Sequence, residues 1–344
     1  MMDLKLLEEL CLANGVSGDE EQVRKILFSA VAPYADHIQT DAMGNLLVFK
    51  KGKRSPKRKL MLSAHMDEVG FIVIDITSDG MLKVEQVGGM DRRVICGKAV
   101  TVGASGVKGV FGIKPVHLSS HEEKEKIPSM EKMYVDIGAE SKEQALRFVN
   151  VGDYAVFDTP FLCREGRVFA KALDDRAGCL VLIEMLKQQL AYDMHFSFLV
   201  QEEVGLRGAA AAAYTVEPYA SIVVESTTAA DTAGVDPSRQ VCRLGEGAVV
   251  SFMDKRTIYD KDYYKLALRC GQHAGVKVQL KQAVAGGNDA GVIHCSRGGV
   301  RTVAVSLPCR YIHSGTSIIT EEDLEAVYQT VFLTAEKIAG DEVV

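Results

Sequence analysis

The chain has 344 residues, of which 47% are hydrophobic and 25% are charged, and its formal net charge at pH 7 is −6. This length allows two domains, and the composition is typical of an ordinary globular protein. The negative charge argues against broad nucleic-acid binding, which requires concentrated Lys and Arg, and no apolar run reaches the ~20 residues that span a bilayer.

The cellular compartment is indicated by the N-terminus and the cysteines. The first residues, Met-Met-Asp-Leu-Lys, lack the basic start and apolar core of a secretory signal. Eight cysteines are present, and none forms a C-x-x-C motif. An even count permits disulfides, but cysteines within apolar runs favour buried free thiols in a reducing compartment. We therefore expect a cytoplasmic protein.

The first 68 residues predict two helices followed by two strands. Ser17 and Glu20 have the spacing of a capping box, and an apolar face with helical periodicity follows between residues 23 and 31. The strands are expected at residues 45–49 and 59–63. The basic segment between them contains Gly52 and Pro56 and no aromatic residue, so it indicates a solvated turn rather than a nucleic-acid patch.

Residues 69–163 have a different sequence pattern, in which short apolar runs alternate with Gly and Asp turns. Strands are expected at residues 70–76, 99–102, 107–113 and 154–157. One helix is expected at residues 142–149, and a mobile loop at residues 121–126. This pattern predicts a small β-rich domain that is inserted into a larger one.

Strands and helices alternate again after residue 168. Strands are expected at residues 195–201, 221–224, 248–252 and 300–307, and helices at residues 174–190, 208–214, 260–274 and from residue 320 onward. This alternation predicts an α/β domain with a mostly parallel sheet covered by helices. Residues 1–68 and 164–344 would form this larger domain.

Acidic and histidine side chains lie where several of these strands end. In open α/β sheets, ligands bind beyond the carboxyl ends of the strands, so we expect these side chains to meet at one rim. They are His65, Asp67, Glu202, Glu203, Glu225 and His313, and Asp174 opens the helix expected at residues 174–190. Carboxylate and imidazole groups are ligands of divalent metal ions, so the set predicts a site for two metals. Taken singly, each motif has a simpler interpretation: a solvated turn for the two glutamates, a helix N-cap for Asp174, and a hydrogen-bonded core histidine for His313.

Four motifs in order, HMDEVG, KALDDRAG, QEEVGLRGA and RYIHS, resemble the M42 family of metallo-aminopeptidases. The resemblance runs from about Leu7 to Ile338. It implies an α/β/α phosphorylase/hydrolase-like catalytic domain with an inserted β-barrel domain. It also implies hydrolysis of the N-terminal residue of short peptides, and an assembly of dimers into a homododecamer through the inserted domain.

The resemblance also implies a role for each residue of the site. His65 and Glu225 would bind one ion, Glu203 and His313 would bind the other, and Asp174 would bridge them through a carboxylate. Glu225 stands where aspartate is commoner in the family. Asp67 would orient His65, Glu202 would be the general base, and the bond between Asp174 and Asp175 would be cis. Zinc or cobalt would be the ions, with manganese as a further candidate.

Several alternatives remain open at this stage. Some relatives carry an endoglucanase label, but glycoside hydrolysis needs two carboxyl groups flanking a sugar, and the chain has no tryptophan for stacking. A non-catalytic metal-binding assembly protein is a second alternative. Asn288, in the segment GGNDAG, fits either a substrate-side loop or a helix cap. The preferred N-terminal residue of the substrate is not indicated.

Overall fold

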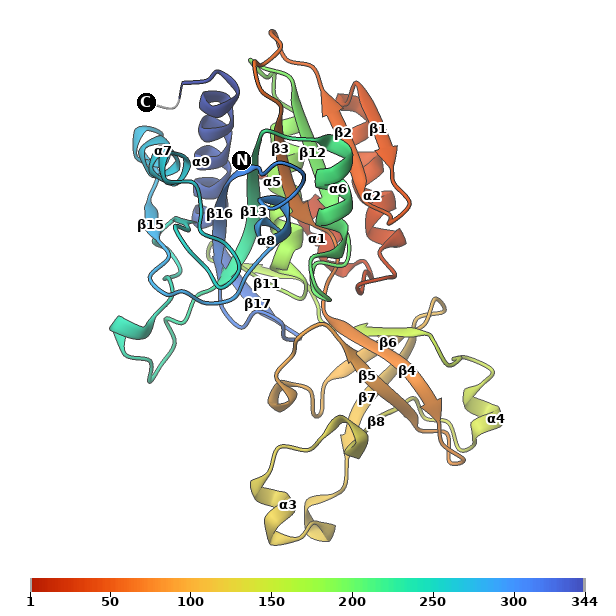
Figure 1. Ribbon diagram of the computed structural model, residues 1–344. Coiled ribbons are helices and arrows are strands. Elements are labelled where there is room, and N and C mark those ends of the chain that lie inside the picture. The colour runs from red at the N-terminus through yellow and green to blue at the C-terminus, as the bar shows by residue number, and fades with distance from the viewer. Residues whose placement is uncertain (1, 343–344) are drawn as a thin grey trace.

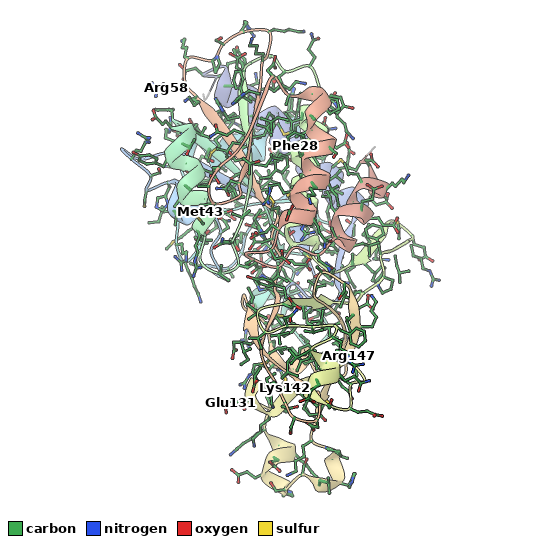
Figure 2. The ribbon with its side chains drawn as sticks, turned by 90° about the vertical axis from the view of Figure 1, so that its right-hand side faces the viewer. Phe28, Met43, Arg58, Glu131, Lys142 and Arg147 are labelled. Carbon is green, nitrogen blue, oxygen red and sulfur yellow. The ribbon has the colours of Figure 1, made fainter. Side chains whose placement is uncertain are left out.

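The computed structural model describes residues 2–342, which form two units (Figure 1). The larger unit contains an eight-stranded sheet with helices on both faces, and the smaller unit is a closed β-barrel. The two units lie end to end, with helix α3 (His121–Glu125) at the far tip of the barrel (Figure 2). None of the helices in residues 2–342 combines the length and apolar character that a membrane span requires.

The large sheet has the strand order β1-β2-β12-β3-β13-β16-β14-β15. Its strands are β1 (His37–Thr40), β2 (Leu46–Lys50), β12 (Met194–Leu199), β3 (Leu60–His65), β13 (Ala220–Thr228), β16 (Arg301–Cys309), β14 (Ala248–Val250) and β15 (Val278–Leu280). The four central strands, β12, β3, β13 and β16, are parallel to one another. The carboxyl ends of these four strands therefore lie at the same edge.

Alternate residues of the central strands face two different helix layers. On β3, Leu60 and Leu62 belong to the core under one layer, whereas Met61 belongs to the core under the other. The first layer consists of α1 (Leu4–Leu12), α2 (Glu21–Val31), α5 (Leu173–Leu186), α7 (Lys261–His273) and α9 (Glu321–Ala339). The second consists of α6 (Arg207–Val216) and α8 (Ala290–Ile293). Both faces of the sheet are thus buried, as the continuous apolar runs of these strands require.

The barrel has the strand order β4-β5-β8-β7-β6-β9 and is closed. Its strands are β4 (Gly70–Ile76), β5 (Leu82–Val87), β8 (Met133–Asp136), β7 (Val107–Ile113), β6 (Ala99–Val102) and β9 (Tyr154–Phe157). Its core includes Phe71, whose ring centroid lies 4.6 Å from that of Phe111 and 5.4 Å from that of Phe157. The barrel begins after β3, and the chain leaves it for a three-stranded sheet of β10 (Leu162–Arg164), β11 (Arg167–Ala170) and β17 (Ser317–Thr320).

Several expected elements differ in the structure. The helix expected at residues 142–149 is only α4 (Lys142–Ala145), and the expected loop at residues 121–126 is the helix α3, where Ser120 and Glu123 form a capping box. Short strands at the sheet edges, such as β1 and β10, were not expected because most of their residues are exposed. The eight thiols, all within residues 2–342, are unpaired, but Cys163 and Cys295 are exposed rather than buried.

Candidate metal centre

The expected site residues meet at the carboxyl edge of the parallel strands. His65 is the last residue of β3, and Glu202 and Glu203 lie just beyond the end of β12. His313 lies beyond the end of β16, and Asp174 lies at the start of α5. Glu225 was expected at the end of its strand, but it lies inside β13, which continues in register with β16 as far as Thr228.

One group of three ligands consists of His65, Asp174 and Glu225. The Nε2 atom of His65 lies 3.2 Å from Oε1 of Glu225 and 3.5 Å from Oδ1 of Asp174. All three residues are buried, and each offers a ligand atom within 4.8 Å of the other two. This separation is suited to a single ion between them.

A second group of three consists of Asp174, Glu203 and His313. The Nε2 atom of His313 lies 3.2 Å from Oδ2 of Asp174 and 3.3 Å from Oε2 of Glu203. Asp174 therefore presents Oδ1 to the first group and Oδ2 to the second. A carboxylate shared in this way is the arrangement that a bridging ligand requires.

The donor set fits divalent metal ions on observations of this structure. Oδ1 of Asp174 and Oε2 of Glu225 are buried and have no hydrogen-bond partner among residues 2–342. A buried polar atom without a partner is costly, and a buried carboxylate is costly unless it is paired or coordinated. Burial raises the pKa of both Glu203 and Glu225, and the nearby carboxylate of Asp174 raises both further. This crowding of buried carboxylates is unfavourable. A cation between these oxygens and the two imidazoles would relieve it.

Asp67 belongs to neither group but holds members of both in place. Its Oδ1 accepts a hydrogen bond from the backbone N–H of Glu202 at 3.0 Å, and its Oδ2 accepts one from that of Glu203 at 3.1 Å. Oδ1 also lies 3.4 Å from Nδ1 of His65. Asp67 thus connects the end of β3 to the loop that carries both glutamates. Contacts of this kind orient metal ligands in many proteins.

The expected capping box at Ser17 is wrong, and Ser17 has a different partner. Its hydroxyl donates a hydrogen bond to Oδ2 of Asp67 at 2.6 Å, whereas the first turn of α2 receives no side-chain cap. Oε1 of Glu20 accepts from the backbone N–H of Gly18 instead. The reason is tertiary: the loop before α2 packs against the segment after β3, where Ser17 N donates to the carbonyl of Glu68.

The backbone around Asp174 is shaped for the site. The bond between Asp174 and Asp175 is cis, and Ala172 has a φ of 54°, in the left-handed region. The carboxylate of Asp175 accepts hydrogen bonds from the backbone N–H groups of His65 and Gly178. Asp175 was not predicted to contribute, since its partner on β3 is 110 residues away in sequence. It joins the start of α5 to the end of β3.

Glu202 stands beside these groups. Its pKa is raised to about 7, first because it is buried and then because the carboxylates of Asp174 and Asp67 lie nearby. A group with a pKa near the working pH is suited to general acid–base catalysis.

A cavity of about 200 Å³ adjoins the site. Four residues of the site contribute to its wall: Asp174, Glu202, Glu225 and His313. Asn288 also lines it, while its Oδ1 accepts from Ala290 N, so the two interpretations of Asn288 are compatible. Lys281 lines the same cavity and was not singled out from the sequence, since nothing near it forms a motif.

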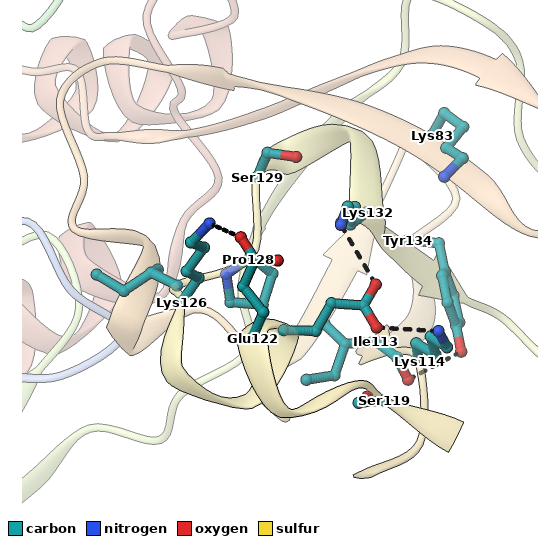
Figure 3. Close-up of a pocket in the computed structure, with 12 residues that line it drawn as sticks. Lys83, Ile113, Lys114, Ser119, Glu122, Lys126, Pro128, Ser129, Lys132 and Tyr134 are labelled. Atoms are coloured by element: carbon teal, nitrogen blue, oxygen red, sulfur yellow. Dashed lines mark hydrogen bonds and ion pairs between the residues drawn. The ribbon is translucent and has the colours of Figure 1, made fainter. Parts of the chain in front are cut away.

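A larger cavity, of about 680 Å³, lies in the barrel unit and contains none of the expected site residues (Figure 3). Its charged side chains already have partners: Lys83 donates to the backbone carbonyl of Glu131, and the others pair with one another. Lys114 contacts Glu123 at 3.0 Å, and Lys132 contacts the same glutamate at 3.4 Å. Lys126 pairs with Glu122. These groups are therefore satisfied within the barrel.

Comparisons with known proteins give a consistent picture. A family model described as M42 glutamyl aminopeptidase matches residues 44–329. The glutamyl aminopeptidase of Lactococcus lactis subsp. cremoris is 32% identical over 331 residues, covering 93% of this chain and 91% of that protein. The lysyl aminopeptidase of Pyrococcus furiosus is 30% identical over 337 residues, covering 94% of each.

Solved structures agree with these matches. A TET aminopeptidase from the marine sediment archaeon Thaumarchaeota archaeon SCGC AB-539-E09 superimposes with a TM-score of 0.94 at 32% identity, covering 99% of this chain and 98% of that one. The Pyrococcus horikoshii TET1 peptidase superimposes with a TM-score of 0.85 at 32% identity, covering 96% of this chain and 98% of that one. It is described as able to assemble into a tetrahedron or a large octahedral shell.

Proposed function

Since the chain belongs to the M42 family of aminopeptidases, we propose that it hydrolyses the N-terminal residue of short peptides at a site for two divalent metal ions. His65, Asp174 and Glu225 would hold one ion, and Asp174, Glu203 and His313 would hold the other. The single observation that supports this most is the position of Asp174, whose two carboxylate oxygens face different histidines.

The chemistry follows from the residues around this pair of groups. When bound, two divalent ions would supply Lewis-acid chemistry, acidifying a water molecule and polarising the scissile carbonyl. Glu202 accepts the proton of the attacking water and then donates it to the leaving amine. Asp67 fixes the backbone of Glu202 and Glu203 through two hydrogen bonds, so it acts by positioning. The carboxylates around the cavity attract the free α-ammonium of the peptide, which restricts cleavage to the first residue.

We also propose that residues 69–163 form an oligomerisation domain within a catalytic domain made of residues 1–68 and 164–344. A P. horikoshii relative is described as forming a tetrahedron or an octahedral shell. A tetrahedron of dimers contains twelve subunits, and closed homo-oligomers are common among enzymes. In this chain, Val116 and Leu118 lie at the tip of the barrel, and their exposed fractions are 70% and 61%. Exposed apolar side chains on a projecting segment support contact with another subunit. Short peptides would be the substrates because a closed shell admits few larger ones.

The proposal is tested with aminoacyl-p-nitroanilides and metal-stripped enzyme. Zinc, cobalt and manganese are added back separately, and hydrolysis is followed against equivalents of ion per subunit. We expect activity to rise until two equivalents are bound, and the metal that supports the highest rate identifies the preferred ion. Activity that persists in excess chelator would contradict the proposal, and chelator-insensitive hydrolysis of cellulose would favour a glycosidase instead.

A further inference from the structure

Asn288 lies in the loop before α8 and lines the cavity of about 200 Å³ together with Glu202 and members of both ligand groups. The residue is buried, and a chain of hydrogen bonds holds its amide from behind. We propose that this amide donates a hydrogen bond to the oxygen of the scissile carbonyl and stabilises the negative charge that develops there. This inference rests on the aminopeptidase function proposed above.

The orientation of the Asn288 amide is fixed on both of its atoms. The backbone N–H of Ala290 donates to Oδ1 at 3.0 Å, and Nδ2 donates to the hydroxyl oxygen of Tyr259 at 3.1 Å. That hydroxyl oxygen also lies 3.3 Å from Oδ1, but its one proton goes to Asp254, so it accepts from Nδ2. An amide nitrogen carries two N–H groups, and the bond to Tyr259 uses one of them. The side chain can therefore present a donor to the cavity.

Tyr259 and Asp254 form the buried support behind this donor. The hydroxyl of Tyr259 donates to Oδ2 of Asp254 at 2.5 Å. Oδ1 of Asp254 accepts from the backbone N–H groups of Arg256 at 2.7 Å and Thr257 at 2.8 Å. Burial and the carboxylate of Asp254 raise the pKa of Tyr259 well above its usual value, so the phenol keeps its proton. A donor held in this way needs little reorganisation when charge develops beside it.

The charge of the cavity wall indicates which group of the substrate Asn288 meets. Asp174, Glu202 and Glu225 line the same wall, and their carboxylates attract an ammonium group but repel a carbonyl oxygen. An amide N–H cannot pair with the α-ammonium of the peptide, because both are donors. It can pair with a carbonyl oxygen. The carbonyl beside Glu202 is the scissile one, since the water that Glu202 deprotonates attacks its carbon.

The proposed step is balanced between the peptide, one water molecule and Glu202. The water oxygen forms a bond to the carbonyl carbon, its proton passes to Glu202, and the π electrons of the C=O bond move to the oxygen that faces Asn288. The C–N bond then breaks, and Glu202 returns the proton to the leaving amine. A donor that meets the charged oxygen stabilises the transition state more than the substrate, so its loss lowers kcat more than it raises KM.

An aminoacyl-p-nitroanilide tests the assignment, because the scissile carbonyl is its only carbonyl group. Asn288→Ala should lower kcat on the order of 10²-fold and leave KM near that of the wild type. Asn288→Asp keeps an acceptor for the N–H of Ala290 but has no N–H to donate, so kcat should fall at least as far. Tyr259→Phe should lower kcat by less, and it should have no further effect when combined with Asn288→Ala.

Binding of a tetrahedral anion gives a readout that does not depend on turnover. Calorimetric titration with the phosphonic acid analogue of the preferred amino acid should give weaker binding to Asn288→Ala than to the wild type. The corresponding primary amine, which lacks the carbonyl group, should bind both proteins equally. Metal content and melting temperatures near those of the wild type, measured on Asn288→Asp as well, would establish that the variants fold and hold their ions.

Two further variants make the result specific. Asn150→Ala, at an exposed residue of the barrel unit, should leave kcat unchanged. Lys281→Met removes another donor of the cavity wall. A wild-type kcat in Asn288→Asp, a loss that appears only in KM, or a loss of kcat in Lys281→Met with none in Asn288→Asp would overturn this inference alone. Failure of the wild-type enzyme to hydrolyse any aminoacyl substrate would instead overturn the proposed function.

Discussion

The hydroxyl of Ser17 donates a 2.6 Å hydrogen bond to Oδ2 of Asp67, a residue 50 positions later in the chain. The same carboxylate oxygen accepts from the backbone N–H of Glu203. Ser17 is therefore joined through one carboxylate to a proposed metal ligand. The loop before α2, which carries none of the four sequence motifs, becomes part of the support of the site.

We predict that Ser17→Ala weakens both the fold and the metal centre. A hydrogen bond to a charged group contributes about 1.5–3 kcal/mol, so the free energy of unfolding should fall by about this amount. Loss of a group that orients metal ligands typically lowers metal affinity or activity by about 10–100-fold. Urea unfolding and metal titration measure the two effects. Ser29→Ala, which removes an exposed hydroxyl on α2, is the matched control; equal effects of the two substitutions would refute the assigned role.

Asp174→Asn is expected to lower the occupancy of both ions, because each oxygen of Asp174 faces a different ligand group. His65→Ala and His313→Ala should each lower the occupancy of mainly one of the two ions. Elemental analysis of the purified variants gives the number of ions per subunit. Two full equivalents in Asp174→Asn would contradict the bridging role.

Glu202→Gln should abolish most activity while metal content stays near that of the wild type. The amide keeps the size of the side chain but cannot accept a proton from water. Loss of a general base typically costs on the order of 10²–10⁴ in rate. If a metal-replete Glu202→Gln enzyme retains the wild-type kcat, Glu202 is not the base.

The tip of the barrel is expected to carry a contact between subunits. Val116→Asp combined with Leu118→Asp places two charges on apolar side chains that are 70% and 61% exposed. Light scattering should then give a mass well below that of the wild-type assembly, for which we expect about twelve subunits. Leu12→Asp, on α1 in the other unit, is the control for an added surface charge. A wild-type monomer, or an unchanged mass in the double variant, would rule out this contact.

His195→Phe should make the protein less sensitive to acid. Burial, helped by the nearby Lys59, lowers the pKa of His195 to about 4, and its ring lies 4.9 Å from that of Phe49. Between pH 6.5 and 4 the unfolded state therefore binds more protons at this residue, so stability falls as the pH falls. We expect the variant to lose about 1 kcal/mol less than the wild type between pH 7 and pH 5. Parallel urea titrations at both pH values measure this loss, and equal losses in the two proteins would show that the pKa of His195 is the same in the folded and unfolded states.

The sequence predicted the parallel sheet and the convergence of the site because both follow from short-range sequence patterns. His65, Glu203 and His313 lie at or beyond the ends of strands with a clear apolar pattern, and parallel strands place their ends together. The bounds of β4, β6, β7 and β9 were also predicted correctly, since their apolar runs end at turn residues.

What the sequence did not predict depends on contacts between distant segments. Ser17 has the local pattern of a helix cap, and only the packing of its loop against Glu68 and Asp67 directs its hydroxyl to the site. Lys281 has no motif, and its burial beside the cavity follows from the pairing of β14 with β15. Glu225 was placed at a strand end because the polar residues that follow it resemble a loop, but pairing with β16 continues past them.

Anomalous diffraction from crystals grown with the metal that best supports hydrolysis tests the central claim most directly. The account predicts two peaks per subunit about 3.5–4 Å apart, with Asp174 between them. One peak should lie beside His65 and Glu225, and the other beside Glu203 and His313. A single peak, or two peaks away from Asp174, in a crystal of active enzyme would contradict it.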